Sequence, residues 1–258
     1  MNHISSAFNK KRKALIAYIP IGYPDVQSTL DAATLLAECG CDIIELGIPF
    51  SDPLADGVTI QNATHRSLLG GVNVRKCLDT AGQISSRIDI PLAFMGYLNP
   101  VLHYGIERFC TDCAGAGVSG LIIPDLPPGE LVELDKSAAK HSLDIIYFLA
   151  PNSPDNRIKL VTHQSHGFIY VVSVTGVTGV RDSVSTGLDG LIIRARELTD
   201  LPLCIGFGIS NPDQARKAAG IADGIIIGSR IIQLMESGSP YQELSKFILD
   251  VRKAIDKI

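Results

Sequence analysis

Short apolar runs of strand length recur along the whole chain. They contain almost only apolar residues, which is typical of parallel strands that are buried on both faces. The runs are residues 15–19, 43–46, 92–95, 120–123, 144–149, 168–172, 203–206 and 224–227. We therefore predict eight buried strands.

The segments between these runs carry apolar residues at helical spacing. In residues 26–39, Leu30, Ala33 and Leu36 share one face of the predicted helix. The other clear helical segments are residues 130–141, 211–219 and 241–258. Asn211, followed directly by a proline, is a typical start of a helix. Strands and helices are thus predicted to alternate along the chain.

Eight strands that alternate with helices over about 250 residues predict an α/β fold of the (β/α)8, or TIM barrel, type. A doubly wound sheet is the competing architecture, but the glycine-rich motif that usually follows its first strand is absent. No linker or low-complexity tract divides the chain, so we expect residues 1–258 to form a single domain. Two longer loops, 49–62 and 175–187, follow the second and sixth predicted strands, where barrels often carry lids.

Composition and charge narrow the classes of function. Of the 258 residues, 46 % are hydrophobic, and the formal net charge is -4. The basic run 10–13 is short, so no nucleic-acid partner is expected. No apolar run reaches the roughly 18 residues of a membrane span, and the apolar residues 14–19 lead directly into Pro20, which favours a first strand over a signal peptide. We expect a cytoplasmic protein with no membrane partner.

Cysteines and histidines give no metal-site pattern. Cys110 and Cys113 form a lone C-x-x-C inside a predicted helix, with no second pair at zinc spacing. We interpret them as reduced, buried thiols that pack as small hydrophobic residues. The six histidines also lack a ligand spacing, so no metal is expected.

Three carboxylates lie on or just after the second predicted strand. Glu45 is near the end of that apolar strand, and Asp52 and Asp56 follow in the loop. Ligands bind at the carboxyl ends of strands in such folds, and an acid among apolar residues is costly unless it is paired, protonated or functional. The segment therefore indicates an enzyme. For Asp52 we favour a turn-forming or structural role.

Two glycine turns follow the last two predicted strands. Backbone N–H groups in these loops of barrels often hold a phosphate group, and glycine lets the backbone approach the phosphate oxygens. Gly208, Gly228 and Ser229 are the candidates, with Gly179 closing the site from the loop after the sixth strand. The alternative is that these glycines only form tight turns.

Several short motifs follow the predicted strands in an ordered series. ELGIPFSDPLADGVTIQNA at 45–63 is far more specific than a general barrel motif. The others are GYP at 22–24, MGYLN at 95–99, PDLP at 124–127, GVTG at 176–179, GFGIS at 206–210 and GS at 228–229. Over almost the whole chain these motifs resemble the tryptophan synthase alpha subunit family.

This resemblance implies a retro-aldol cleavage of indole-3-glycerol phosphate into indole and glyceraldehyde 3-phosphate. Glu45 is implied as the acid that protonates the ring and then as the base that accepts the hydroxyl proton, which requires a pKa near neutrality. Asp56 is implied as the carboxylate that accepts the indole N–H and stabilises the positive charge that forms on the ring.

The resemblance also implies substrate-binding residues. Tyr170 matches a position close to the substrate, where it either binds the glycerol hydroxyl or packs in the core. Thr178 matches a loop threonine that contacts an aspartate, for which Asp56 is the expected partner. The side chains expected to line an apolar indole pocket, or otherwise to pack as core, are Tyr18, Met95, Tyr97 and Ile209. Position 174 departs from the pattern, because Val174 stands where a basic residue is often found. The resemblance therefore does not fix the details of how that loop closes.

The family works as an α2β2 heterotetramer, in which the beta subunit uses pyridoxal phosphate (PLP) to join indole to serine. The resemblance thus implies a beta-subunit partner and no cofactor in this chain. The expected partner surface comprises Asp52, Pro53, residues 98–103 and the PDLPPGE segment at 124–130. Two alternatives remain: another phosphate-binding barrel enzyme, such as an isomerase or epimerase, and a catalytically idle subunit that activates a beta partner.

Overall fold

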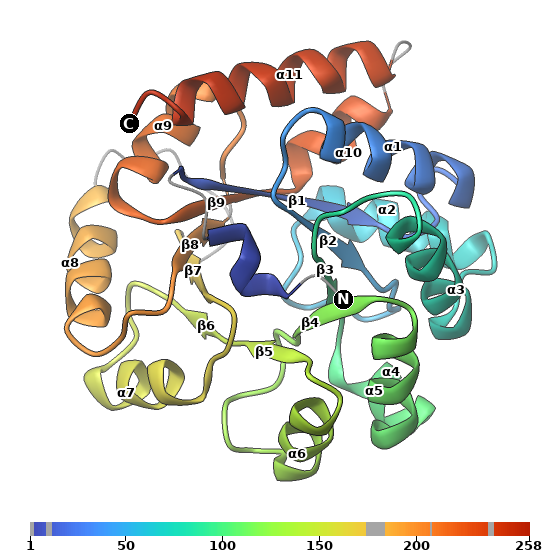
Figure 1. Cartoon of the computed structure of the whole chain (residues 1–258), viewed down its shortest axis with the longest axis horizontal. Helices are drawn as coiled ribbons and strands as arrows, with labels where there is room; N and C mark the ends of the chain where they lie inside the picture. Colours follow the sequence, from blue (N-terminus) through green and yellow to red (C-terminus); the bar gives the residue numbers. More distant parts are fainter. Residues whose placement is uncertain (1–2, 9–11, 174–183, 207, 237–239) are drawn as a thin grey trace.

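The strands of the chain form one parallel sheet that curls into a barrel (Figure 1). The computed structural model describes residues 3–8, 12–173, 184–206, 208–236 and 240–258. The strands are β1 (Ala14–Pro20), β2 (Ile43–Gly47), β3 (Leu92–Met95), β4 (Val118–Ile122), β5 (Asp144–Ile146), β6 (Phe148–Leu149), β7 (Ile169–Val172), β8 (Leu203–Gly206) and β9 (Gly224–Ile227). Their order is β5-β4-β3-β2-β1-β9-β8-β7-β6. The predicted TIM barrel is confirmed.

The described strands number nine rather than eight because the predicted strand 144–149 is interrupted. Tyr147 separates β5 from β6, and its hydroxyl donates a hydrogen bond to Asp135 at 2.9 Å. β5 pairs with β4, whereas β6 pairs with β7. The two ends of the sheet are therefore adjacent in sequence, and the chain itself completes the nearly closed barrel.

Helices surround the barrel. The α-helices are α1 (Val26–Glu38), α2 (Val58–Leu69), α3 (Val74–Ser85), α4 (Leu98–Tyr104), α5 (Ile106–Gly115), α6 (Val132–Lys140), α7 (Asp155–Gln164), α8 (Val184–Arg196), α9 (Pro212–Ile221), α10 (Ser229–Met235) and α11 (Pro240–Ile255). The predicted N-cap is confirmed, since the Asn211 side chain accepts a hydrogen bond from the Gln214 N–H at 2.9 Å. Several predicted bounds were wrong by a few residues: the last helix ends at Ile255, α6 begins only at Val132, β4 begins already at Val118, and α8 begins inside the predicted loop 175–187.

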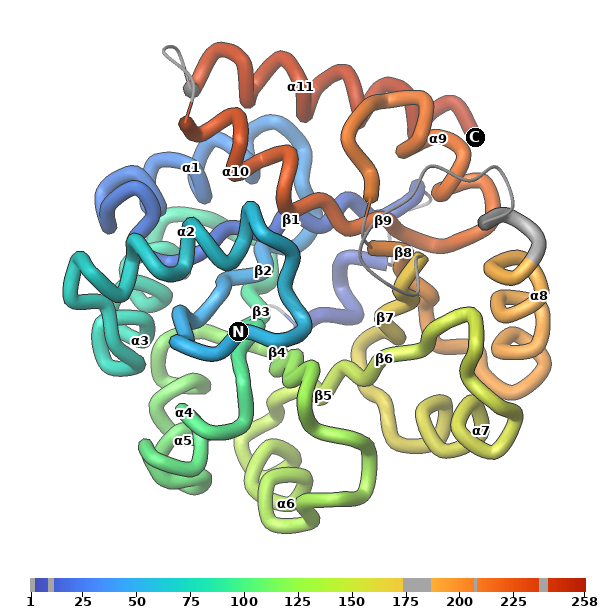
Figure 2. The backbone as a smooth tube through the Cα atoms, turned by 180° about the vertical axis from the view of Figure 1, so that it is seen from behind, coloured from blue at the N-terminus to red at the C-terminus, as the bar shows by residue number. Residues whose placement is uncertain are grey.

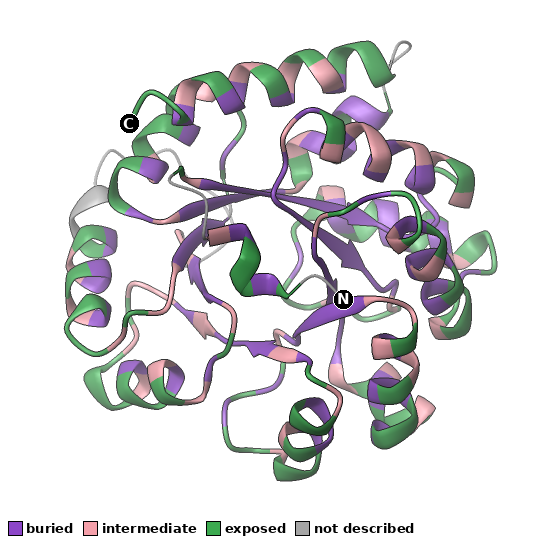
Figure 3. Ribbon diagram, in the orientation of Figure 1, coloured by how far each residue is buried: buried purple, intermediate pink, exposed green. Residues whose placement is uncertain are grey.

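Alternate residues of each strand face opposite sides, which gives the molecule two apolar layers. One cluster fills the barrel interior and includes Ile16, Tyr18 and Ile43. The other packs between strands and helices and includes Ile44 and Leu46. Figure 3 shows the strands almost entirely buried, with exposed residues on the outer faces of the helices. This alternation decides which strand residues point into the barrel interior.

A short 3-10 helix, η1 (Ile4–Phe8), lies in the middle of the ring in Figure 1 (dark blue). Ile4 is fully buried and belongs to the interior cluster, and the Phe8 ring packs against that of Phe168 at 6.0 Å between centroids. Sequence analysis did not anticipate this element. It covers one end of the barrel, so a ligand enters from the other.

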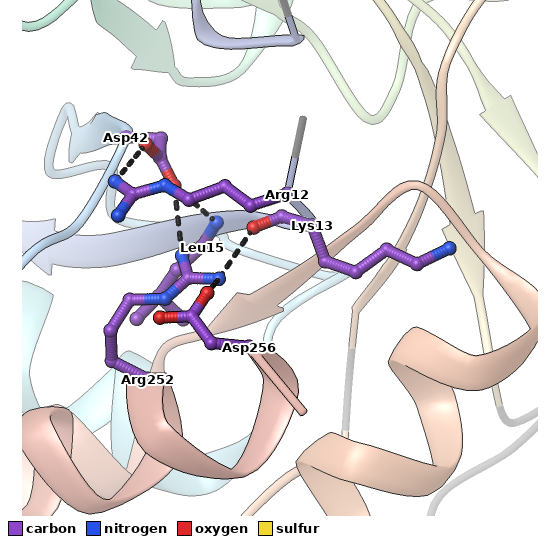
Figure 4. Close-up of polar contacts among 6 residues, drawn as sticks. All are labelled: Arg12, Lys13, Leu15, Asp42, Arg252 and Asp256. Carbon is purple, nitrogen blue, oxygen red and sulfur yellow. Dashed lines mark hydrogen bonds and ion pairs between the residues drawn. The ribbon is translucent and has the colours of Figure 1, made fainter. Parts of the chain in front are cut away.

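A buried ion cluster fastens the last helix to the beginnings of the first two strands (Figure 4). Asp42 accepts hydrogen bonds from Arg12 Nη2 at 2.7 Å, Arg252 Nη1 at 3.0 Å and the Leu15 N–H at 3.0 Å. Arg252 also donates to the Lys13 carbonyl at 2.8 Å. Because Asp42 precedes β2, these contacts hold in place the strand that carries Glu45.

None of the helices that the structure describes is long and apolar enough to cross a lipid bilayer.

Candidate active site

The alternation of β2 turns Glu45 into the barrel. Ile43 belongs to the interior cluster, and Ile44 and Leu46 belong to the outer one, so Glu45 shares the inward face with Ile43. The parallel register sets Glu45 opposite Tyr18 on β1 and Ala93 on β3. The Glu45 carboxylate therefore points into a part of the barrel interior that is largely apolar and aromatic.

Glu45 is fully buried, and neither of its carboxylate oxygens has a hydrogen-bond partner among the described residues. Burial raises the pKa of Glu45 to about 8, and the nearby charge of Asp56 adds to the rise. An unpaired acid in such a place is costly to the fold and typical of a catalytic group. Near neutral pH Glu45 is largely protonated and able to donate a proton.

Asp56 comes to the site from the loop that follows β2. It is 9 % exposed, whereas Asp52, four residues earlier, is exposed and accepts a hydrogen bond from the Ser51 hydroxyl at 2.5 Å. The Asp56 N–H donates to the Pro53 carbonyl at 3.1 Å, which closes a tight turn. Burial raises the pKa of Asp56 to about 6, against a hydrogen bond from Tyr97 that lowers it. Asp56 is thus largely ionised at the pH at which Glu45 is protonated.

A cavity of about 170 Å³ opens at this end of the barrel. It exceeds the ~10–15 Å³ that a single water needs by more than tenfold, so it suits a small organic molecule. The lining residues are Tyr18, Glu45, Ile60, Met95, Tyr170, Gly208, Ile209, Ser210, Ile226, Gly228, Ser229, Arg230 and Gln233. Apolar side chains surround Glu45, and polar groups gather toward α10.

The end of the cavity near α10 has backbone groups of the kind that suit an anion. Gly208 has a φ of +78°, which favours glycine, and no atom lies within 4 Å of the place where its Cβ would be. Gly228 directly precedes Ser229, the first residue of α10, whose first N–H groups have no partner within the helix. Arg230 lines the same end, and its guanidinium lies over the Phe247 ring of α11, 5.9 Å from the ring centroid. Backbone N–H groups at such a place suit a phosphate group.

Two tyrosines pack tightly against strand glycines inside the barrel. A Cβ on Gly47 would lie 2.3 Å from the Tyr18 hydroxyl oxygen, and one on Gly206 would lie 2.4 Å from that of Tyr170. Both contacts are far below van der Waals distance, so glycine is required at each place. The two glycines let the aromatic rings lie across the barrel and form walls of the cavity.

Most of the predicted site residues meet at this cavity. Those that line it are Tyr18, Glu45, Met95, Tyr170, Gly208, Ile209, Gly228 and Ser229. Asp56 and Tyr97 lie beside the cavity rather than among its lining residues. The predicted residues Thr178 and Gly179 lie outside the residues that the structure describes.

Sequence reasoning missed five lining residues: Ile60, Ser210, Ile226, Arg230 and Gln233. The signals for two of them were available. Ile226 is two residues before Gly228 on an alternating strand, and Arg230 directly follows the predicted glycine turn. Ile60 and Gln233 depend on how α2 and α10 pack together, which Figure 2 shows from behind. That packing is not readable from one sequence.

Neither the cysteines of α5 nor the other potential metal ligands that the structure describes form a reactive or metal-binding group. Cys110 and Cys113 are free and buried on α5, as predicted. Burial raises the pKa of the Cys113 thiol well above its ordinary value, which keeps the thiol protonated and unreactive. Within the described ranges, no group of three or more His, Cys, Asp and Glu side chains is placed to hold a metal ion.

Known proteins of similar sequence and structure include tryptophan synthase alpha chains. A family model described as tryptophan synthase alpha chain matches residues 4–256. The tryptophan synthase alpha chains of Dehalococcoides mccartyi and Geobacter sulfurreducens are 53 % and 43 % identical, with 99 % of this chain covered in each case and 100 % and 99 % of the relative. A tryptophan synthase subunit alpha structure from Legionella pneumophila has a TM-score of 0.90 at 32 % identity, with full coverage of both chains. A Mycobacterium tuberculosis tryptophan synthase structure has a TM-score of 0.91 at 38 % identity, covering 99 % of this chain and 98 % of that one.

Proposed function

The chain belongs to the tryptophan synthase alpha chain family, and we propose that it cleaves indole-3-glycerol phosphate into indole and glyceraldehyde 3-phosphate. One observation carries the proposal: Glu45 is buried, has no hydrogen-bond partner among the described residues and borders the cavity, close to a second carboxylate. The family's role is this alpha reaction beside a beta subunit, and the carboxylate pair suits its chemistry.

Glu45 carries both proton transfers. Its protonated carboxyl donates a proton to the indole ring carbon that bears the glycerol chain, which leaves a positive charge shared with the ring nitrogen. The Glu45 carboxylate then accepts the proton of the hydroxyl on the adjacent glycerol carbon. The carbon–carbon bond breaks, its electron pair returns to the ring, and the hydroxyl carbon becomes the aldehyde. A pKa of about 8 suits one group to both steps.

Asp56 stabilises the intermediate. Its carboxylate accepts a hydrogen bond from the indole N–H and balances the charge that forms on the ring. This requires an ionised Asp56, and a pKa of about 6 leaves it ionised near neutral pH. The rate should therefore fall as the pH drops below about 6, where Asp56 is protonated, and as it rises above about 8, where Glu45 loses its proton.

The rest of the cavity fits the two ends of the substrate. Met95, Ile209 and the ring of Tyr18 offer an apolar slot to the indole. Gly208, Gly228 and Ser229 offer backbone N–H groups to the phosphate, with Arg230 as a nearby cation. Tyr170 lies in the cavity wall, 4 % exposed, where its hydroxyl suits the glycerol chain. In this proposal Thr178 and Gly179 close the site.

A beta subunit is the proposed partner, in an α2β2 heterotetramer. Exposed apolar side chains follow three neighbouring strands: Leu54 after β2, Leu102 after β3 and Val132 after β4 are 93 %, 49 % and 54 % exposed. Such a group of apolar residues is typical of an interaction surface. Leu102 lies within a predicted partner segment, and Leu54 and Val132 lie one and two residues beyond the other two. The proton transfers need no cofactor in this chain, and PLP belongs to the partner. We place the complex in the cytoplasm, in keeping with six free cysteines.

Gel filtration with the cognate beta chain tests the partner. The two chains should elute as one complex, and Leu54→Asp should weaken it. Ile193→Asp, at a 61 % exposed position on α8, is the control and should leave the complex intact. Separate elution of the unaltered chains, or equal binding by the two variants, would contradict the proposed surface.

Indole release from indole-3-glycerol phosphate tests the reaction, with and without the beta chain. The wild type should release indole, and Glu45→Gln should lower kcat by orders of magnitude because an amide neither gives up nor takes up a proton near neutral pH. Glu38→Gln, the same change at an exposed position on α1, should be neutral. A wild type that binds its partner but releases no indole would favour the idle-subunit alternative. Turnover of another phosphate ester in its place would favour the isomerase.

A further inference from the structure

Tyr97 contacts the loop that follows β2 and carries Asp56, and it is not among the residues that line the cavity. Its hydroxyl oxygen accepts a hydrogen bond from the Ala55 N–H at 3.0 Å. The same hydroxyl lies close enough to the Asp56 side chain to lower the pKa of that carboxyl group, and its own O–H stays available as a donor because a phenol has one donor and two acceptor positions. The hydroxyl therefore holds the backbone directly before Asp56 and faces the Asp56 carboxyl group.

The Tyr97 side chain is itself held firmly. Tyr97 is 5 % exposed, and its ring stacks on Phe50, which belongs to the same loop as Asp56, at 5.3 Å between centroids. The neighbouring Leu98 N–H donates to the Asp125 carboxylate at 2.9 Å. This bond caps the start of α4, for which Tyr97 supplies no side-chain cap. These contacts fix the position of the Tyr97 hydroxyl relative to the loop that carries Asp56.

The Asp56 loop needs such an anchor. Asp56 precedes α2, whose N-cap is Gly57 and lacks a side-chain hydrogen bond. One oxygen of Asp56 is buried without a hydrogen-bond partner among the described residues. Local contacts thus leave part of the carboxylate unheld, although the reaction needs it aimed at the indole nitrogen.

We propose that Tyr97 is the positioning residue of Asp56: by holding the backbone at Ala55, its hydroxyl sets the direction of the Asp56 carboxylate relative to Glu45. This inference rests on the proposed function, and it deepens it by giving the tyrosine a task other than binding the indole ring. The hydroxyl acts through Asp56 and does not touch the substrate.

The hydroxyl also affects the charge of Asp56. Among the residues that the structure describes, the ionisable groups that face Asp56 are Glu45 on β2, Tyr18 on β1, Tyr170 on β7 and Tyr97 after β3. The hydrogen bond from Tyr97 lowers the pKa of Asp56, whereas burial raises it. Without the hydroxyl this pKa rises, and the acidic limb of the pH–rate profile moves to higher pH.

Tyr97→Phe tests the proposal, because it removes the hydroxyl and keeps the ring on Phe50. Indole release is measured against pH in the complex with the beta chain. The kcat should fall by about 10- to 100-fold, because the carboxylate is misplaced, while KM stays within about threefold. The acidic limb should move up by ~0.5–1 pH unit, the worth of one hydrogen bond. Tyr104→Phe removes a hydroxyl that donates to Asp112 away from the site, and it should change nothing.

A second variant should shift the acidic limb of the pH–rate profile in the opposite direction. 3-Fluorotyrosine at position 97 strengthens the donor, so the acidic limb should move to lower pH, opposite to the Phe variant. Equal kcat and equal acidic limbs in the wild type and Tyr97→Phe would overturn the positioning role alone, provided that the wild type releases indole. A wild type that releases none overturns the proposed function together with this inference.

Discussion

Replacing Glu45 by Gln should abolish activity and at the same time remove a pH-dependent burden on the fold. The folded-state pKa of Glu45 lies at about 8, above its ordinary value of 4.5. For an acid, a raised pKa means that the folded chain holds the proton more tightly than the unfolded one. The fold is therefore favoured at low pH, and this advantage is lost as the pH rises from about 4.5 to about 8.

The magnitude follows from the two pKa values. Within that window each pH unit changes the free energy of unfolding by about 1.4 kcal/mol. A rise from pH 5 to pH 7.5 should thus cost the wild type about 3 kcal/mol through Glu45 alone. The amide that replaces the carboxyl group in Glu45→Gln does not titrate, so the variant is free of this cost. Asp56 titrates in both proteins, and its contribution largely cancels in the difference.

Urea unfolding at pH 5 and at pH 7.5 measures this difference. The stability of Glu45→Gln relative to the wild type should increase by about 3 kcal/mol between the two pH values, while Glu38→Gln should follow the wild type. The comparison depends on the change with pH and not on how well the amide fits the site. If Glu45→Gln and the wild type differ equally at both pH values, Glu45 has an ordinary pKa and cannot be the acid.

Three further substitutions test the packing and ion pairs of the barrel and its helices. Arg252→Ala leaves the buried Asp42 without one of its ion pairs and should lower the free energy of unfolding by about 3–5 kcal/mol; a loss below about 1 kcal/mol in urea unfolding would show that Asp42 tolerates the change. Gly206→Ala puts a methyl group 2.4 Å from the Tyr170 hydroxyl, so both kcat and the melting temperature should fall; unchanged values would refute the tight contact. Gly190→Ala, inside α8 where a Cβ meets nothing within 4 Å, should instead raise the stability by ~0.5–1 kcal/mol, and a decrease in calorimetry would contradict this.

The barrel was predictable because its strands carry a strong and simple signal. Strands that are buried on both faces read as short apolar runs, and the bounds predicted for the third, seventh and eighth runs match β3, β8 and β9. Glu45 was equally readable, since an acid inside such a run is rare and strand alternation allows only two directions for it. Local pattern and tertiary structure agree at these places.

Features that depend on long-range packing were not predictable in the same way. The break at Tyr147 arises where the barrel closes, a constraint on the whole sheet that residues 144–149 do not reveal. The 3-10 helix at Ile4 is stabilised by burial against Phe168, far away in sequence. The family resemblance implied Tyr97 in the indole pocket, but the direction of its side chain depends on contacts with Phe50 and Ala55.

The division of labour between the two carboxylates follows from where each is attached. Glu45 sits on a strand inside the barrel, where neighbouring side chains exclude water and offer it no hydrogen bond among the described residues, so its pKa rises to about 8. Asp56 sits on a loop at the rim, where Tyr97 offsets part of the same effect, and its pKa rises only to about 6. Between these values one group is neutral and the other charged, as a proton donor and a charge stabiliser must be. Exchanging the two residues would place aspartate, the stronger acid in water, at the strand position, where the proton is needed. Burial at that position raises the pKa of either carboxyl group, so the barrel itself, more than the residue type, assigns the acid role to the strand position.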